Sequence, residues 1–168
     1  EQDPDTHEIV SLVVAPEHHR LALAGGSFST AIGGTVVRGE GAYYWAKQLA
    51  TESPLIGDGV FERDYVHYLI GVDWVLFGVN MSAQFVEEVI LDYDDALASD
   101  ERSDVVTFLA SDSFMNETLH LEFFSYVGLN DSDALLRPKA SYDMADGFEI
   151  VVGADLFMGD EGMFGAYD

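Results

Sequence analysis

The chain contains no cysteine and very few basic residues. Its 168 residues hold only 7 Lys and Arg against 31 Asp and Glu, which gives a formal net charge of −24 at pH 7. The lack of cysteine excludes disulfides, thiolate metal sites and cysteine nucleophiles. Nucleic-acid binding needs clustered Lys and Arg, so no nucleic-acid partner is expected. The acidic excess also argues against docking on an anionic membrane surface.

Long apolar runs are absent as well. A transmembrane helix needs about 18 or more apolar residues in a row, whereas the most apolar segment, residues 68–79, is broken by Asp73 and by glycines. No helical span is therefore predicted. Residues 1–4 carry neither a basic nor an apolar leader region, so the chain is expected to be a mature product or a fragment. With 48% hydrophobic residues and no linker, residues 1–168 are predicted to form a single ordered domain.

What the sequence does contain is a period of two. In residues 148–158, Phe148 and Ile150 alternate with polar positions such as Glu149 and Asp155. Such alternation predicts a β-strand, and its length suits a tilted membrane-spanning strand of ~9–11 residues.

The segment before it predicts the other half of a hairpin. Residues 135–143 alternate in the same way, and residues 144–147 (Met-Ala-Asp-Gly) end in a strong tight-turn signal. Pro138 is the one irregular position, because a central strand loses a ladder hydrogen bond at proline.

The same pattern recurs along the chain and predicts an all-β, antiparallel, up-and-down meander of about 8–9 strands, part of a transmembrane β-barrel. The predicted strands are residues 7–15, 20–29, 34–46, 64–75, 79–90, 104–112, 117–128, 135–143 and 148–158. Short turns near 31, 77, 114 and 145 alternate with longer polar segments at 47–63, 91–104, 129–133 and 159–168. The parity of residues 79–90 fails after Phe85, which predicts a bulge or the rim.

Alternation alone does not decide which face meets water. A soluble sheet turns its apolar face inward, whereas a membrane barrel turns it outward to lipid. Long strands, unequal turn lengths at the two ends and aromatic residues near strand ends favour the membrane barrel. The predicted lipid-facing aromatic girdle is Tyr43, Trp45, Tyr68, Trp74, Tyr142 and Phe148. The alternative is a soluble, lipocalin-like ligand-binding barrel.

On the membrane-barrel interpretation, the opposite face lines the lumen. The predicted lumen-facing residues are Arg38, Glu40, Asp73, His120, Glu122, Arg137, Lys139, Asp143, Glu149 and Asp155. Three of the 7 basic residues, Arg38, Arg137 and Lys139, belong to this set. They either shape the field of a pore or pair with neighbouring acids as cross-strand salt bridges.

Two segments resemble a known kind of protein. Residues 25–35 read G-G-S-F-S-T-A-I-G-G-T and residues 38–44 read R-G-E-G-A-Y-Y. They resemble the "G-x-S-F-x-T-x-L-G-G-T" turn and following "R/S-G-E-x-x-Y" strand of a family of Gram-negative outer-membrane β-barrels, porin-like and alginate-export-like in style. Residues 136–165 look like the penultimate hairpin of such barrels. Because such barrels usually end on a strand with a terminal aromatic residue, this chain is expected to be a C-terminal portion without its closing strand.

That resemblance implies an outer-membrane location, contact with outer-membrane lipid and passive passage of small solutes. It supplies no catalytic residues, and the chain is not expected to be an enzyme. An enzyme borne on a barrel would need a Ser/His/Asp or acidic constellation at one rim, and none is recognised from the sequence, in which Glu122 and Glu149 are a carboxylate pair of unknown separation.

No metal site and no cofactor are predicted. The pair His18–His19 lacks a third ligand at a recognised spacing. The acids Asp92, Asp94 and Asp95, and residues 130–133, lack the glycine and glutamate spacing of an EF-hand. Divalent cations that screen these acidic loops are retained as candidate partners.

Overall fold

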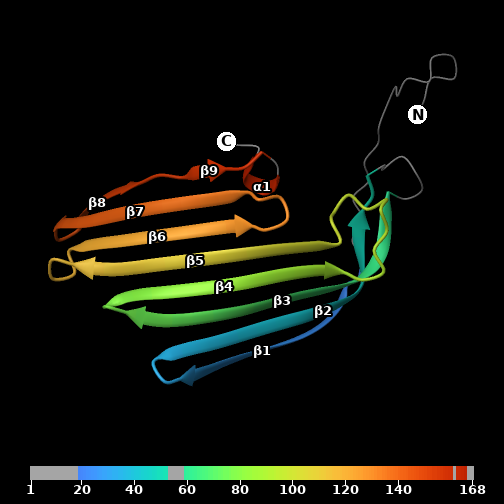
Figure 1. Cartoon of the computed structure of the whole chain (residues 1–168), viewed down its shortest axis with the longest axis horizontal. Helices are drawn as coiled ribbons and strands as arrows, with labels where there is room; N and C mark the ends of the chain where they lie inside the picture. Colours follow the sequence, from blue (N-terminus) through green and yellow to red (C-terminus); the bar gives the residue numbers. More distant parts are fainter. Residues whose placement is uncertain (1–18, 53–58, 161, 166–168) are drawn as a thin grey trace, which may run out of the picture.

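All strands in the described part of the chain belong to one antiparallel sheet. The computed structural model describes residues 19–52, 59–160 and 162–165. The order is β1 to β8, each beside the next in sequence, with β9 paired to β7 (Figure 1). The strands are β1 (Ala22–Ile32), β2 (Thr35–Ala50), β3 (Val60–Leu76), β4 (Val79–Ile90), β5 (Arg102–Phe114), β6 (Leu119–Gly128), β7 (Ala134–Ala145), β8 (Phe148–Gly153) and β9 (Leu156–Met158).

This nine-stranded meander confirms the predicted all-β, antiparallel, up-and-down fold. Within the described part of the chain, β1 does not pair with β8 or β9, so the sheet is not closed. The one helix in the described residues, α1 (Gly162–Gly165), is a single turn. No described helix is long and apolar enough to cross a membrane. The predicted strand at 7–15 and His18 lie outside the described residues.

The four short turns follow the predicted order, with the turns at 77–78 and 146–147 close to their predicted places and the first, at 33–34, about two residues after the predicted position near 31. Gly33, Gly78 and Gly147 adopt positive φ angles of 63°, 91° and 78° at the turns that leave β1, β3 and β7. The remaining turn, after β5, lies two residues later than predicted. Ser113 still belongs to β5, and residues 115–118 make the turn, which the Thr118 hydroxyl closes by donating to the Met115 carbonyl at 2.7 Å.

The sheet carries its main bulge in a different place from the one the sequence suggested. The β2–β3 register shifts between Tyr44 and Lys47, with Ala46 at a φ of 50°. The Ala46 amide donates to Asp64 Oδ1 at 3.0 Å, which stabilises the bulge. Past it, β2 and β3 run on into the segment predicted as a loop.

The bulge proposed after Phe85 is wrong, because β4 pairs with both neighbours without a register shift. Glu87 breaks the alternation because it points to the otherwise apolar side near the rim. It is only 3% exposed, and it accepts a hydrogen bond from the Tyr68 hydroxyl and pairs with Arg102. A buried carboxylate paired in this way is tolerated on an apolar face.

Pro138 accounts for a break in the last predicted strand. The Ala154 amide donates to the Pro138 carbonyl at 3.1 Å, but proline has no N–H to return the bond. Residues 154–155 therefore leave the ladder, and the predicted strand 148–158 is divided into β8 and β9.

Loop 91–101 folds back over one end of the sheet. Leu97 forms a bridge with Thr51, and the Ala98 amide donates to the Ala50 carbonyl at 3.0 Å. Leu97 packs with Leu49, Tyr65 and Ile90, all buried, in the small core of the molecule. In Figure 1 this end, where β2 and β3 bend away from the rest of the sheet, lies at the right.

Candidate functional site

The register places the predicted lumen residues and the predicted girdle residues on opposite sides of the sheet. Opposed residues of an antiparallel pair point to the same side, and neighbours along a strand point to opposite sides. Arg38 lies opposite Gly71, and Gly71 lies opposite Gln84 in turn. Following this register across the sheet places all ten predicted lumen residues on one side, called the polar face: Arg38, Glu40, Asp73, His120, Glu122, Arg137, Lys139, Asp143, Glu149 and Asp155.

The other side is called the apolar face. It carries all six residues predicted for the aromatic girdle, Tyr43, Trp45, Tyr68, Trp74, Tyr142 and Phe148. Nothing in the described part of the chain packs over it. Ile70 at its centre is 53% exposed, and Val152 near the β8 edge is 67% exposed.

Two of the predicted girdle residues, Tyr43 and Trp74, are well separated along the strands, whereas Phe85, opposite Ile70, lies at the centre of the apolar face. Tyr43 lies opposite Val66 of β3, and Trp74 lies eight residues after Val66 on the same strand. At about 3.3 Å per residue this separation is roughly 26 Å along the strand.

Two tyrosines predicted for the girdle, Tyr43 and Tyr68, have partners for their hydroxyl groups. Tyr43 donates to Asp64 Oδ2 at 2.5 Å, and Tyr68 donates to Glu87. Their rings thus remain on the apolar face while their polar ends are satisfied near the rim.

Ion pairs cross the strands of the polar face. Arg38 pairs with Asp73 and also donates to the Ser82 hydroxyl at 3.2 Å. Arg137 donates two hydrogen bonds to the Asp155 carboxylate, from Nε at 2.6 Å and from Nη2 at 3.1 Å. The sequence allowed these arginines either to shape the field of a pore or to pair with neighbouring acids, and in the structure both form ion pairs. Lys139 lies directly opposite Glu122 in the register.

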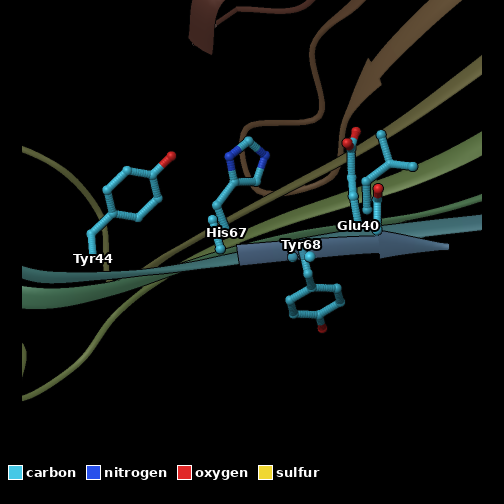
Figure 2. Close-up of a pocket in the computed structure, with 9 residues that line it drawn as sticks. Glu40, Tyr44, His67 and Tyr68 are labelled. Carbon is cyan, nitrogen blue, oxygen red and sulfur yellow. The ribbon is translucent and has the colours of Figure 1, made fainter. Parts of the chain in front are cut away.

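A hollow of about 450 Å³ opens on the polar face over β1, β2 and β3. Figure 2 shows Glu40, Tyr44 and His67 on one side of the sheet and Tyr68 on the other. His67 Nδ1 is 4.0 Å from Glu88 Oε1. A carboxylate, an imidazole and a phenol thus line the same hollow.

A second hollow, of about 220 Å³, lies between β5, β6 and β7 near the short turns. In it, Ser113 Oγ is 2.8 Å from His120 Nδ1. On the far side of the ring, His120 Nε2 is 3.6 Å from Asp143 Oδ2. The sequence prediction missed this Ser–His–Asp arrangement because it placed Ser113 inside the turn. With the turn at 115–118, Ser113 and His120 become cross-strand partners.

The loop that covers the long-loop end is strongly acidic. Burial raises the pKa of Tyr93 above its usual 10.0, and the charges of Asp95 and Asp100 raise it further. Arg63 reaches into this loop, with Nη2 3.6 Å from Asp94 Oδ2. In residues 19–52, 59–160 and 162–165, no three His, Asp or Glu side chains are arranged to hold a metal ion.

Taken together, the fold and the two faces define an open antiparallel β-meander that is charged on one side and apolar on the other. No family model matches the chain, and no curated protein sequence matches it. The two faces are therefore the observations that bear on its function.

Proposed function

We propose that this chain is a segment of a Gram-negative outer-membrane β-barrel that lets small solutes pass passively along its polar face. The observation that carries the proposal is the uncovered apolar face, with Ile70 half-exposed at its centre. Soluble monomers rarely expose contiguous apolar patches larger than a few hundred Å². Lipid would cover this face without any further protein layer.

The curvature of the sheet supports the same assignment. In Figure 2, the strands that follow β3 rise on the side to which Glu40 and His67 point. The polar face is thus turned towards the rest of the sheet, as the lumen side of a membrane barrel is. In a soluble lipocalin-like barrel, the apolar face would turn inward to hold a ligand.

The charges support passage of cations over anions. Within the described residues, the basic side chains Arg38 and Arg137 are neutralised by acids on the same face. Asp92, Asp94 and Asp95 add negative charge in the loop at one end, and the whole chain carries −24. Such a field concentrates cations at a mouth, including divalent cations that would screen the acidic loops.

The first test is the partition of the purified chain between buffer and detergent micelles, with far-UV circular dichroism on both fractions. The proposal expects β-rich protein that stays dispersed only with detergent. Chain reconstituted into planar lipid bilayers should then give steady, cation-selective conductance. Monodisperse β-rich protein in plain buffer would overturn the membrane assignment and favour the soluble ligand-binding barrel.

A further inference from the structure

The hollow between β5, β6 and β7 holds the components of a nucleophilic site. Ser113 and His120 face each other across the β5–β6 pair, with Oγ 2.8 Å from Nδ1. Asp143 on β7 lies 3.6 Å from the other ring nitrogen. Serine is activated as a nucleophile when its hydroxyl is hydrogen-bonded to an imidazole and a carboxylate orients that imidazole.

The position of Ser113 makes it accessible. It is the next-to-last residue of β5, its side chain is exposed, and the turn with Met115, Asn116 and Glu117 in the left-handed region follows at once. Three serines line the hollow, Ser111, Ser113 and Ser141, and of these Ser113 is the one hydrogen-bonded to His120.

The hollow also holds groups that can stabilise a developing oxyanion. Lys139 and Asn80, whose side chains carry an ammonium and an amide, both line it, together with Asp112 and Glu122. Positive charge or an N–H donor near the reacting carbonyl is usually the largest single contribution to acyl transfer. A volume of about 220 Å³ suits a short acyl chain, so the fitting substrates are small carboxylic esters.

We propose that Ser113, His120 and Asp143 form a hydrolytic site for short-chain carboxylic esters. The Ser113 oxygen bonds to the acyl carbon while its proton passes to His120 Nδ1. The ester C–O bond then breaks, and the leaving alcohol takes that proton. Water next attacks the acyl-serine, giving one proton to His120, and the Ser113–acyl bond breaks as Oγ recovers the proton and the carboxylic acid leaves. Asp143 is a positioning residue that holds the imidazole and stabilises its charged form.

The site is tested first on the unaltered full chain, folded in whichever medium keeps it β-rich. The chain is exposed to a fluorophosphonate probe, and the labelled peptide is identified by mass spectrometry. The expected result is a single label on Ser113. A label on Ser111 or Ser141 instead, or no label on a chain with native circular dichroism, would overturn the proposal. The Ser113–His120 contact would then be an ordinary cross-strand hydrogen bond. The readout does not depend on conductance, so the failure of either proposal leaves the other standing.

Variants then test the individual roles with p-nitrophenyl acetate. Ser113→Ala should abolish burst release of p-nitrophenol, while the matched controls Ser111→Ala and Ser141→Ala retain it. His120→Gln should slow labelling by about 100-fold or more, the usual contribution of a general base. Asp143→Asn should lower kcat with KM unchanged, and Asp143→Glu should restore part of the loss. Ser113→Ala with an unchanged burst and unchanged circular dichroism would overturn the proposal.

Discussion

The ring of Phe28 lies over Gly39 on the neighbouring strand of the apolar face. The two residues are direct partners in the β1–β2 pair. A Cβ added at Gly39 would lie 2.5 Å from Cε1 and 2.8 Å from Cζ of the Phe28 ring. The ring therefore fills the space that the missing side chain leaves, as in the aromatic rescue of glycine in β-sheets.

Gly39→Ala is expected to lower the free energy of unfolding by about 1–3 kcal/mol, the usual range for a side chain forced into occupied space. The matched control is Gly26→Ala, since a Cβ at Gly26 meets nothing within 4 Å. Unfolding by urea, followed by tryptophan fluorescence, measures both.

If the clash causes the loss, Phe28→Ala should relieve part of it. The double variant Phe28→Ala/Gly39→Ala should then show a coupling of about 0.5 kcal/mol or more. Strictly additive effects would mean that the ring does not occupy the space over Gly39.

The second prediction distinguishes lipid from water at the apolar face. Ile70 is 53% exposed and lies midway between Val66 and Trp74 on β3. If water covers it, Ile70→Arg should change stability by no more than about 0.5 kcal/mol. If lipid covers it, the same change should cost about 2–4 kcal/mol.

The neighbouring Leu69→Arg is the matched control, because Leu69 lies opposite Glu40 on the polar face. The two variants carry the same added charge on opposite sides of one strand. Guanidinium titrations of chain folded into phospholipid vesicles supply the comparison. If both variants lowered the free energy of unfolding by the same small amount, the proposal that lipid covers the apolar face would be wrong.

The sequence was sufficient to predict on which side of the sheet the residues of the alternating segments lie, because a period of two is fixed by the geometry of an extended chain. Turns carried by glycine were predictable for a similar reason: Gly33, Gly78 and Gly147 supply the positive φ that tight turns require. The turn after β5 was misplaced because three consecutive non-glycine residues, Met115 to Glu117, adopt positive φ. No local pattern predicts such a choice.

Features that depend on a distant partner were also missed. Glu87 stays on the apolar face only because Tyr68 and Arg102, from the two neighbouring strands, satisfy its carboxylate. The Ser113–His120 contact required the correct turn, since a shift of two residues places different residues opposite each other. The lumen and lipid roles of the two faces remain predictions for the experiments described above.

The third prediction concerns the loop that covers one end of the sheet. Leu97 is 2% exposed in a cluster with Leu49, Tyr65 and Ile90. Leu97→Ala should cost about 2 kcal/mol, the low end for a buried leucine, because the cluster is small. The loss should be local and open the loop rather than unfold the sheet.

Hydrogen exchange measures this opening directly. The amides of Glu52 and Ala98 donate across the loop to Ala96 and Ala50. In Leu97→Ala they should exchange roughly 30-fold faster, the factor equivalent to about 2 kcal/mol. Leu129→Ala, at a half-exposed loop leucine, is the control and should leave both rates unchanged. Unchanged exchange in Leu97→Ala would show that the cluster does not hold the loop.

The fourth prediction uses the Arg38–Asp73 pair to ask whether ions travel along the polar face. Both side chains are about one-third exposed, at 34% and 32%, so their pairing contributes little to stability. Their charges would still act on a passing ion. A unit charge about 8 Å from an ion in water is worth roughly 0.5 kcal/mol, a twofold effect on permeability.

In planar bilayers with a KCl gradient, Arg38→Gln should raise the ratio of cation to anion permeability roughly four- to sixfold, because the energy of a passing cation falls and that of an anion rises by about 0.5 kcal/mol each. Asp73→Asn should lower it by a similar factor, and the double variant, whose net charge equals that of the original chain, should return it to the starting value. Because the two single changes move the field in opposite directions, a general disturbance of the fold cannot imitate the pattern. If both variants shifted the permeability ratio in the same direction, or neither shifted it, the conduction path would lie away from Arg38 and Asp73. The proposal that the polar face lines a pore would then be wrong.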